Sequence, residues 1–236
     1  MSRVLVTGST DGLGRRSAEA LLDAGNEVIV HARSDERARV LQPLLDRGAT
    51  LVIGDLASES HVRAIADEVA AREVDAIIHN AGVNTGGQIF AINVLAPYLM
   101  TALSPQVHRH VYLSSGMHLS GSPTVDMQHE GSVSYADSKL LITAFAAALP
   151  RYREETVAHA VDPGWVATRM GGPGAPDDLE AGHETQDWLA TTEDNAVRDF
   201  GYWFHRARRD PNPAALDEAF QDRVVHVLAE RSGVTL

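Results

Sequence analysis

The sequence contains no cysteine, no long apolar run and no excess of positive charge. Without cysteine the chain has neither a disulfide framework nor a cysteine-based zinc site, and a cytoplasmic setting fits. No apolar stretch approaches the roughly 18 residues of a membrane span, and the first residues carry no signal-peptide pattern. The formal net charge of −12 argues against nucleic acid or an anionic membrane as the main partner, because both require a basic face.

What the sequence does contain is a regular alternation of short apolar segments and longer amphipathic ones. The predicted strands span residues 3–7, 27–32, 49–56, 74–82, 110–115 and 156–163, and the predicted helices span residues 13–24, 35–46, 59–73, 93–103 and 133–149. With 236 residues, of which 44% are hydrophobic, we expect one domain over residues 1–236. The alternation predicts an α/β fold, a doubly wound, Rossmann-like parallel sheet with helices on both faces.

The last third of the chain is less regular. Glycine and proline are concentrated at residues 162–178, and amphipathic helices are predicted at residues 177–190 and 217–233. We expect a substrate loop and lid at about residues 168–192, because such segments commonly close over bound substrate. The alternative is a surface helix with no gating role.

Gly8, Gly12 and Gly14 lie between the first predicted strand and the first predicted helix. Glycines at such a turn let the backbone approach a pyrophosphate, and the N-terminus of the helix supplies N–H donors. The spacing Gly-x-x-x-Gly-x-Gly differs from the usual dinucleotide pattern, and the Gly-Lys-Ser/Thr needed for nucleotide triphosphate hydrolysis is missing. The alternative is a tight turn in which the glycines serve only packing.

The glycine turn is the first of six motifs that resemble, in order, those of the short-chain dehydrogenase/reductase family. The others are HNAG (residues 79–82), the asparagine Asn93, YLSSGMH (residues 112–118), YADSK (residues 135–139) and DPGWVATRM (residues 162–170). The resemblance spans about residues 3–170. It implies an oxidoreductase that uses a nicotinamide cofactor and acts on a small carbonyl or alcohol substrate.

Reduction of a carbonyl requires a hydride on carbon, which a nicotinamide supplies, and a proton on oxygen, which the protein must supply. Tyr135 and Lys139 are four residues apart and share one face of a predicted helix. The lysine ammonium is therefore expected to lower the tyrosine pKa from its usual value near ~10. The alternative is an ordinary amphipathic helix with a tyrosine and a solvated lysine.

The resemblance implies a catalytic tetrad of Asn93, Ser115, Tyr135 and Lys139. In this tetrad Tyr135 is the acid or base, and Lys139 tunes it and binds the nicotinamide ribose. Ser115 orients the carbonyl oxygen in preference to its neighbour Ser114, since successive residues of a strand point to opposite faces. Asn93 holds a water that links Lys139 to solvent.

The end of the second predicted strand favours the phosphorylated cofactor. An acidic residue there would bond the adenosine ribose of NAD, but Arg33 occupies this turn and no carboxylate comes before Asp35. Arg15 follows the glycine turn, and arginine pairs well with phosphate. Both arginines favour NADP(H) over NAD(H). The alternative is that both are surface charges.

The resemblance implies further cofactor contacts at the glycine turn, after the third and fourth predicted strands, and in the loop after the sixth. The predicted cofactor-binding residues are Gly8, Ser9, Thr10, Gly12, Leu13, Gly14, Arg15, Arg33, Asp55, Leu56, Asn80, Ala81, Gly82, Tyr135, Lys139, Pro163, Gly164, Val166 and Thr168. In the family pattern Asp55 contacts the adenine, and Val166 and Thr168 contact the carboxamide.

The chain departs from the family pattern in two segments. Residues 83–92 are fewer than the family usually has, which puts the register of Asn93 in doubt. Helices in this region often build the family's oligomer interface, so a homo-oligomer is left open. The segment between Ser115 and Tyr135 is longer than the family minimum, as in retinol-dehydrogenase-like and ketoreductase-like members. Its candidates for the substrate pocket are Met117, His118, Met127 and His129.

The remaining signals are weaker, and none predicts a metal site or a macromolecular partner. The histidines at residues 108–110 lack a further ligand at metal spacing, and the basic stretch at residues 206–211 is typical of a solvated face. The sequence thus predicts an NADPH-dependent oxidoreductase that transfers hydride to a ketone or aldehyde, or the reverse. The alternatives are a cofactor-binding sensor without turnover, an NAD-linked alcohol dehydrogenase, and an epimerase or dehydratase with the same Tyr/Lys pair.

Overall fold

The computed structural model describes residues 1–194 and 197–236. In this part of the chain eight strands form one sheet in the order β3-β2-β1-β4-β5-β6-β7-β8, parallel except for the antiparallel β7–β8 pair. The strands are β1 (Arg3–Val6), β2 (Glu27–Ala32), β3 (Thr50–Ile53), β4 (Ala76–His79), β5 (Arg109–Leu113), β6 (Val157–Asp162), β7 (Gly201–Phe204) and β8 (Ala207–Arg209). The strand order reverses between β1 and β4, which is the switch point where ligands bind in such sheets.

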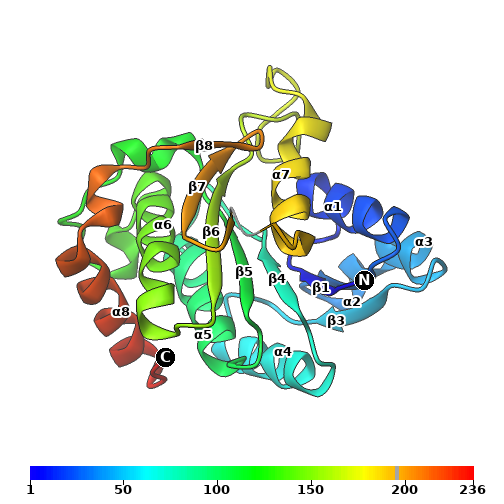
Figure 1. Ribbon diagram of the computed structural model, residues 1–236, viewed down its shortest axis with the longest axis horizontal. Helices are drawn as coiled ribbons and strands as arrows, with labels where there is room; N and C mark the ends of the chain where they lie inside the picture. The colour runs from blue at the N-terminus through cyan, green and yellow to red at the C-terminus, as the bar shows by residue number, and fades with distance from the viewer. Residues whose placement is uncertain (195–196) are drawn as a thin grey trace.

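Helices cover both faces of the sheet (Figure 1). One layer contains α1 (Gly12–Asp23), α2 (Asp35–Ala38), α3 (Gln42–Leu45) and α7 (Leu179–Thr191), and the other contains α4 (Glu59–Ala71), α5 (Ala96–Leu103), α6 (Tyr135–Tyr152) and α8 (Glu218–Ser232). In Figure 1, α7 lies beside α1 and α8 lies beside α6. Within residues 1–194 and 197–236, no helix combines the length and apolarity that crossing a membrane requires. The single-domain, doubly wound α/β fold predicted from the sequence is confirmed.

Alternate residues of the central strands belong to opposite cores. In β1, Leu5 belongs to the core on the side of α4, α5, α6 and α8, whereas Val4 and Val6 belong to the core on the side of α1 and α7. All three side chains are fully buried. The two-residue repeat of a strand causes this division, and a strand covered on both faces is apolar at successive positions. Burial of each such side chain contributes roughly 1.5–3 kcal/mol to stability.

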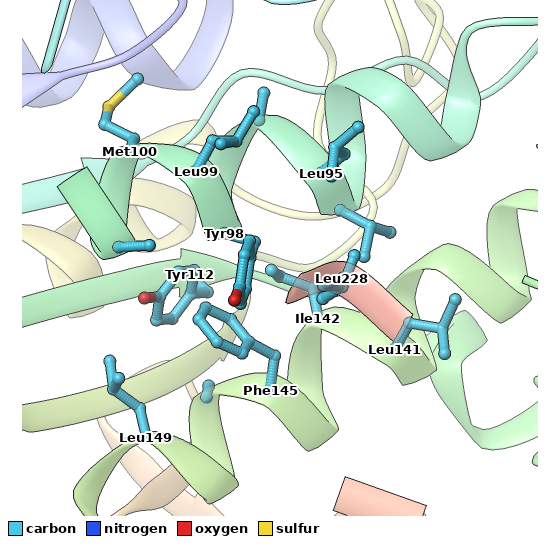
Figure 2. Packing of buried hydrophobic residues seen from close by; sticks show 14 of the residues in the cluster. Leu95, Tyr98, Leu99, Met100, Tyr112, Leu141, Ile142, Phe145, Leu149 and Leu228 are labelled. Atoms are coloured by element: carbon cyan, nitrogen blue, oxygen red, sulfur yellow. The ribbon is translucent and has the colours of Figure 1, made fainter. Parts of the chain in front are cut away.

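An aromatic cluster fixes α6 against β5 and α5 (Figure 2). The ring centre of Phe145 on α6 lies 5.3 Å from that of Tyr98 on α5 and 5.5 Å from that of Tyr112 on β5. The Tyr112 hydroxyl is hydrogen-bonded to the Thr101 hydroxyl at 2.7 Å, so its burial leaves no polar group unpaired. Leu228 of α8 packs in the same cluster. The sheet, α5 and α8 thus hold α6 in place, and with it the residues at its N-terminus.

Two regions differ from the elements that the sequence predicts. The helix expected over residues 35–46 is broken into α2, a 3-10 turn (Arg39–Leu41) and α3, because Pro43 has no backbone N–H and fits only the first turn of a helix. The hairpin of β7 and β8 was not predicted, because His205 and Arg206 occupy its turn at φ values of 46° and 60°, where asparagine and glycine are usual. Arg206 is exposed, as expected for a solvated stretch, and its guanidinium lies 4.9 Å from the ring centre of Trp188.

The second half of the predicted lid is α7, which packs against α1. Gln186 of α7 donates a hydrogen bond of 2.7 Å to Oγ of Ser17 on α1, and both side chains are fully buried. Leu189 is also fully buried. Such a helix cannot swing away without exposing apolar surface and breaking a buried hydrogen bond. Closure over a ligand stays a prediction, and it would fall to the irregular residues 168–178.

Candidate cofactor and catalytic site

The glycine turn joins β1 to α1 and depends on a backbone approach that only glycine allows. Gly8 has a φ of +69°, and a Cβ there would lie 3.0 Å from Cα of Ala81. A Cβ on Gly14 would lie 2.5 Å from the carbonyl oxygen of Gly8 and would collide with the amide of Asn80. The loop after β4 therefore sits directly against the turn. A turn of this shape at the N-terminus of α1 fits a pyrophosphate.

Buried polar side chains anchor the turn from beneath. Oγ of Ser9 donates to the carbonyl oxygen of Val6 and accepts from the backbone N–H of His31 at 3.0 Å. Nδ1 of His31 accepts from the N–H of Gly8 at 3.0 Å, and its Nε2 lies 2.8 Å from the carbonyl oxygen of Gly54. Burial lowers the pKa of His31, which keeps the ring neutral with Nδ1 as the acceptor. Ser9, a predicted cofactor contact, supports the turn and does not line the cleft described next.

A cleft of about 360 Å³ extends from the glycine turn to the N-terminus of α6 along the carboxyl ends of the strands. This volume lies in the usual range of ligand sites, roughly 300–1,000 Å³. The predicted residues that line it are Gly8, Thr10, Gly12, Leu13, Arg33, Asp55, Leu56, Asn80, Ala81, Gly82, Tyr135, Lys139, Pro163 and Thr168. The lining residues that the sequence analysis missed are Asp11, His31, Arg37, Val83, Gln88, Ile92, Leu113, Ser114, Arg169 and Met170.

A larger hollow, of about 430 Å³, lies at the opposite, amino ends of β1, β2 and β3. Its charged groups all have partners: Nε of Arg3 lies 2.7 Å from Oε2 of Glu27, and the Arg72 guanidinium pairs with Glu68 at 2.5 Å. None of the six motifs contributes to it. The residues of the motifs therefore gather at the other cleft, at the switch point of the sheet.

Only one of the two arginines predicted to bind phosphate lines the cleft. That residue is Arg33, whereas Arg15 pairs with Glu19 at 2.9 Å and donates to the carbonyl oxygen of Val40 at 3.1 Å. Arg37 lines the cleft as well. The sequence contained a signal for each of these two findings. Arg15 and Glu19 have the spacing of a helical ion pair, and Arg37 follows Arg33 by four residues.

Tyr135 is the first residue of α6, which begins there because Ser134 and Asp137 form a capping box. Oγ of Ser134 accepts from the N–H of Asp137 at 3.2 Å, and the Asp137 carboxylate accepts from the N–H of Ser134 at 3.0 Å. The Tyr135 hydroxyl lies 4.0 Å from Sδ of Met170, in the loop after β6. Local capping therefore places the tyrosine at the mouth of the cleft.

The two neighbouring serines after β5 point in opposite directions. Ser115 lies close enough to the Tyr135 hydroxyl for its side chain to lower the tyrosine pKa. Ser114 is buried and hydrogen-bonded to the hydroxyl of Thr143 at 2.7 Å, within α6. Successive strand residues face opposite sides, so only one of the pair reaches the tyrosine, and it is the one that the sequence analysis preferred.

Lys139 lies one turn after Tyr135, with Nζ at 5.4 Å from the centre of the tyrosine ring. Nζ donates to the carbonyl oxygen of Leu113 at 2.7 Å. Burial lowers the pKa of Lys139 to about 8, and Asp162 opposes this shift. Burial raises the pKa of Tyr135, whereas its hydrogen bond with Ser115 lowers it. The expected lowering of the Tyr135 pKa is therefore wrong here, because burial outweighs an ammonium that points toward Leu113.

Asp162, the last residue of β6, adds a carboxylate that the sequence analysis did not assign. Oδ1 accepts from the N–H of Gly164 at 3.0 Å, and Oδ2 accepts from the hydroxyl of Tyr202 at 3.3 Å. A Cβ on Gly116 would lie 3.1 Å from Oδ2, so the carboxylate faces the turn that follows β5. Its charge raises the pKa values of the tyrosine and lysine at the start of α6. A lone aspartate before Pro-Gly gives no signal in a sequence.

Asn93 lies on a π-helical turn (Ala91–Leu95) that leads into α5. Nδ2 donates to the carbonyl oxygen of Val83 at 2.8 Å, and Oδ1 accepts from the N–H of Val83 at 2.9 Å. A Cβ on Gly82 would lie 3.3 Å from Oδ1 of Asn93 and 3.7 Å from Nζ of Lys139. The short segment before Asn93 therefore leaves it beside the lysine, and wide helical turns of this kind are frequent at functional sites.

The loop after β6 folds back over the glycine turn. Pro163 and Thr168 line the cleft, and a Cβ on Gly12 would lie 3.2 Å from Cγ2 of Thr168. Gly164 adopts a φ of +83°, and Val166 is buried. These last two predicted cofactor contacts do not line the cleft, so they shape the loop.

The four pocket candidates before α6 lie in different environments. His118 is buried, with Nδ1 at 2.8 Å from the carbonyl oxygen of Ser115, and its Nε2 accepts an N–H from the segment before α8. Met127 is buried in the core. His129 pairs with an aspartate on an exposed turn. Only Met117 is exposed beside the site, where its N–H donates to Oγ of Ser115 at 3.2 Å.

The histidines at residues 108–110 do not form a metal centre. Across the described residues, no group of three or more histidine, aspartate or glutamate side chains is arranged to hold a metal ion. His110 is fully buried, and its Nδ1 lies 3.1 Å from Nε2 of His79 on the neighbouring strand. Burial lowers the pKa of His110 to about 3, so this pair is a neutral part of the sheet.

Known proteins are similar to this chain in sequence and in fold. The short chain dehydrogenase family model matches residues 2–178. The short-chain dehydrogenase chyC of Penicillium rubens is 32% identical, and the match covers 100% of this chain and 99% of that protein. A protein from Mycobacterium paratuberculosis has a TM-score of 0.82 at 22% identity, over 100% of this chain and 94% of that one. A Shigella flexneri short chain dehydrogenase complexed with NADP has a TM-score of 0.70 at 22% identity, over 86% and 95% of the two chains.

Proposed function

This chain belongs to the short-chain dehydrogenase family and is an oxidoreductase of that family, and on this premise we propose that it transfers a hydride between NADP(H) and a ketone or aldehyde, or the corresponding alcohol. The observation that carries the proposal is a single cleft that holds Tyr135 and Lys139 at one end and the glycine turn with two arginines at the other. A proton donor thus shares one cleft with a phosphate-binding turn, and Ser115 lies next to that donor.

The cofactor end fits a phosphorylated dinucleotide. The backbone approach at Gly8 and Gly14 supports a pyrophosphate at the N-terminus of α1. Arg33 and Arg37 support a 2′-phosphate at the end of β2, where NAD would require a carboxylate. Asp55 would meet the adenine. The NADP in the Shigella flexneri structure agrees with this choice, although that likeness concerns the fold.

Tyr135 would supply the proton during reduction. Because burial raises its pKa, its hydroxyl is protonated at ordinary pH, as a general acid requires. A bound nicotinamide supplies the hydride. As the proton passes to the carbonyl oxygen, Ser115 holds that oxygen and the ammonium of Lys139 stabilises the phenolate left behind. The reverse reaction needs the phenolate beforehand, so the raised pKa favours reduction near neutral pH.

Lys139 and Asn93 would return the proton to the phenolate. With a pKa of about 8, Lys139 exchanges protons close to neutral pH. Its Nζ and Oδ1 of Asn93 flank Gly82, which leaves the asparagine beside the route from the lysine to solvent. A water held by Asn93 would complete the relay. Lys139 would also leave the carbonyl oxygen of Leu113 to reach the ribose.

The substrate end favours a carbonyl compound with an apolar body. Met117 and Leu119 follow β5, and they are 54% and 60% exposed. Trp165 and Met170 follow β6, and they are 60% and 43% exposed. Of these four residues Met170 lines the cleft, and exposed large apolar side chains are typical of a surface that an apolar ligand covers. The carboxylate of Asp162 disfavours anionic substrates at the same place.

A homo-oligomer, which the family resemblance left open, stays a proposal. α6 is buried along most of its length by other elements of its own chain, including α8. The Tyr98 hydroxyl on α5 also donates to the carbonyl oxygen of Val234, beyond α8, at 2.7 Å. Self-association through α6 would have to displace α8, so we propose that any assembly uses another surface. Sedimentation velocity of the protein with and without a deletion of α8 tests this.

The experiment combines binding and turnover in one preparation. The protein is titrated with NADPH and with NADH by cofactor fluorescence, and NADPH oxidation is then followed with aryl ketones and apolar aldehydes. We expect tighter binding of NADPH and measurable oxidation. Tyr135→Phe should lower kcat by about 10²–10⁴-fold and leave NADPH binding within about twofold. Tyr152→Phe, at the other end of the same helix, is the matched control and should keep full activity.

Each other outcome has a definite meaning. Tighter binding of NADH would overturn the preference for NADP(H) and leave the catalytic proposal standing. Binding of NADPH without oxidation by any carbonyl would favour a cofactor sensor. Binding of neither cofactor would remove the support that the glycine turn gives to the whole proposal. A Tyr135→Phe variant with unchanged kcat would exclude the tyrosine as the acid.

A further inference from the structure

Asp11 places a carboxylate at the phosphate end of the cleft. It comes directly before Gly12 and lines the cleft together with Arg33 and Arg37. Oδ2 of Asp11 lies 2.8 Å from Nη2 of Arg37. Nε of Arg169, in the loop after β6, lies 3.9 Å from the same oxygen. One carboxylate therefore stands between two cations that border a predicted phosphate site.

The two arginines near the end of β2 are in different states. Nη2 of Arg37 donates to Oγ1 of Thr10 at 3.0 Å and to Asp11 at 2.8 Å, so its guanidinium already has two acceptors. Arg33 is exposed, and no carboxylate in residues 1–194 or 197–236 forms an ion pair with it. An incoming anion therefore meets Arg33, which has no carboxylate partner in the described part of the chain, and Arg37, which is already bonded to Thr10 and Asp11.

A 2′-phosphate must compete with Asp11 for Arg37. Such a phosphate carries a charge between about −1.5 and −2 at neutral pH, and a carboxylate within a few ångströms repels it. The Asp11–Arg37 pair is partly exposed, with 50% and 25% of the side chains accessible, so water moderates the effect without removing it. The ribose hydroxyl of an unphosphorylated cofactor meets no such repulsion and can donate a hydrogen bond to the same carboxylate.

We propose that Asp11 is a specificity-determining residue that restrains the preference for NADP(H), because its carboxylate holds the guanidinium of Arg37 and opposes the 2′-phosphate. The inference rests on the proposed function, since it requires a nicotinamide dinucleotide in this cleft. When the phosphate takes Arg37, Asp11 turns to Arg169, which is the other cation within its reach. Asp11 thereby sets how much more tightly NADP(H) binds than NAD(H), whereas Arg33 and Arg37 determine that NADP(H) is the cofactor that binds more tightly.

The test measures dissociation constants of NADPH and NADH by cofactor fluorescence on the purified chain. Asp11→Asn should tighten NADPH binding about fivefold at low ionic strength and change NADH binding by less than about twofold. The gain should shrink in about 0.5 M salt, because the opposed charges are screened. Arg37→Ala should weaken NADPH binding about tenfold without affecting NADH. In the Arg37→Ala background, Asp11→Asn should have less effect, since the two side chains share one interaction.

Controls separate a charge effect from a change of the loop. Arg39→Ala removes an exposed arginine from the same short segment, outside the cleft, and should change neither affinity. Asp11→Ser repeats the test with a smaller side chain, in case the asparagine variant folds poorly, and competition by adenosine 2′,5′-bisphosphate reports the phosphate site without the nicotinamide. Thermal unfolding of each free variant shows whether the loop itself is altered.

Two results would overturn the inference. One is an unchanged ratio of the NADPH and NADH dissociation constants in Asp11→Asn and Asp11→Ser. The other is an equal weakening of both cofactors with no dependence on salt, which would give Asp11 a purely structural part in the glycine turn. A wild-type protein that binds neither cofactor would instead contradict the proposed function, so the two failures can be told apart.

Discussion

The two ends of the cleft are built from different parts of the chain. At the cofactor end the walls are backbone, and at Gly14 the space left for a side chain ends 2.5 Å away at a carbonyl oxygen. At the substrate end the wall includes an exposed side chain, that of Met170 at 43% exposure. Backbone contact suits a ligand that is always the same, whereas exposed side chains can be exchanged without disturbing the sheet. The first end is therefore fixed by the fold and the second is open to variation.

Gly14→Ala should break the cofactor end and have the largest effect. The added Cβ would overlap the carbonyl oxygen of Gly8, so the turn must move, at a cost of about 2 kcal/mol or more in stability. NADPH binding should weaken at least about 30-fold, measured by the same titration. Gly87→Ala is the matched control, because a Cβ there meets nothing within 4 Å. Wild-type affinity in Gly14→Ala would mean that the turn adapts and that its close packing is dispensable.

Acid should weaken the sheet beneath the two ends of the cleft. Burial lowers the pKa of His110 to about 3 and that of His159 to about 4, below the ordinary value near ~6.5. The unfolded chain then binds more protons, so stability is complete above about pH 6.5 and is lost as the pH falls toward 4. The loss at pH 5 should be about 2 kcal/mol per buried histidine.

Urea unfolding at pH 7.5 and pH 5 measures this loss. His159→Gln should give a shallower dependence on pH, because one group that takes up a proton only on unfolding has been removed. His226→Gln changes an exposed histidine on α8 and should keep the wild-type slope. Equal stability of the wild-type protein at the two pH values would show that these histidines take up protons in the folded sheet as readily as in the unfolded chain.

Met117→Ala should weaken the binding of apolar substrates without disturbing the fold. Loss of this exposed side chain should raise KM for an apolar aryl ketone about fivefold, with little change for a short aliphatic aldehyde. The temperature of unfolding should stay within about 1 °C, since the side chain is largely exposed. Val40→Ala removes a similarly exposed residue far from α6 and should change neither quantity. A KM that rises equally for both substrates would argue against an apolar pocket.

Asp162→Asn should have the smallest effect at neutral pH. Reduction falls as the pH rises through the pKa of Tyr135, because the acid loses its proton. The Asp162 carboxylate raises that pKa, so its removal should move the falling limb of the kcat profile to lower pH and leave the rate at pH 7 within about twofold. Asp126→Asn, on an exposed turn, should leave the profile in place. An unmoved limb in Asp162→Asn would show that the carboxylate does not influence the acid during turnover.

The cofactor end could be read from the sequence because its determinants are local. The three glycines, the end of β2 and the Tyr/Lys spacing each lie within one turn or one strand, so spacing alone places them. Arg15 does not line the cleft because its guanidinium turns back along α1 to Glu19, and that direction depends on the side-chain rotamer rather than on the position in the sequence.

The substrate end could not be read in the same way because its arrangement is tertiary. His118 and Met127 stand in one polar, irregular segment with Met117, yet the first two are buried and the third is exposed. Burial there is decided by distant partners, such as the segment before α8 that donates an N–H to His118. Asp162 meets the hydroxyl of Tyr202 on β7, a strand that the sequence did not predict. The pattern of neighbouring residues in a sequence does not indicate which distant residues these side chains will contact.

The hydrogen bond between Ser17 and Gln186 joins residues 169 positions apart. Contacts of such separation form late, because a long loop must be closed before they contribute any stability. During synthesis the face of α1 that carries Ser17 therefore lacks its partner until α7 has been made. The helix that begins the cofactor cleft is among the first to be synthesised, but its packing is completed late. A cofactor would then act too late to guide folding, and its effect would be to slow the unfolding of the finished molecule.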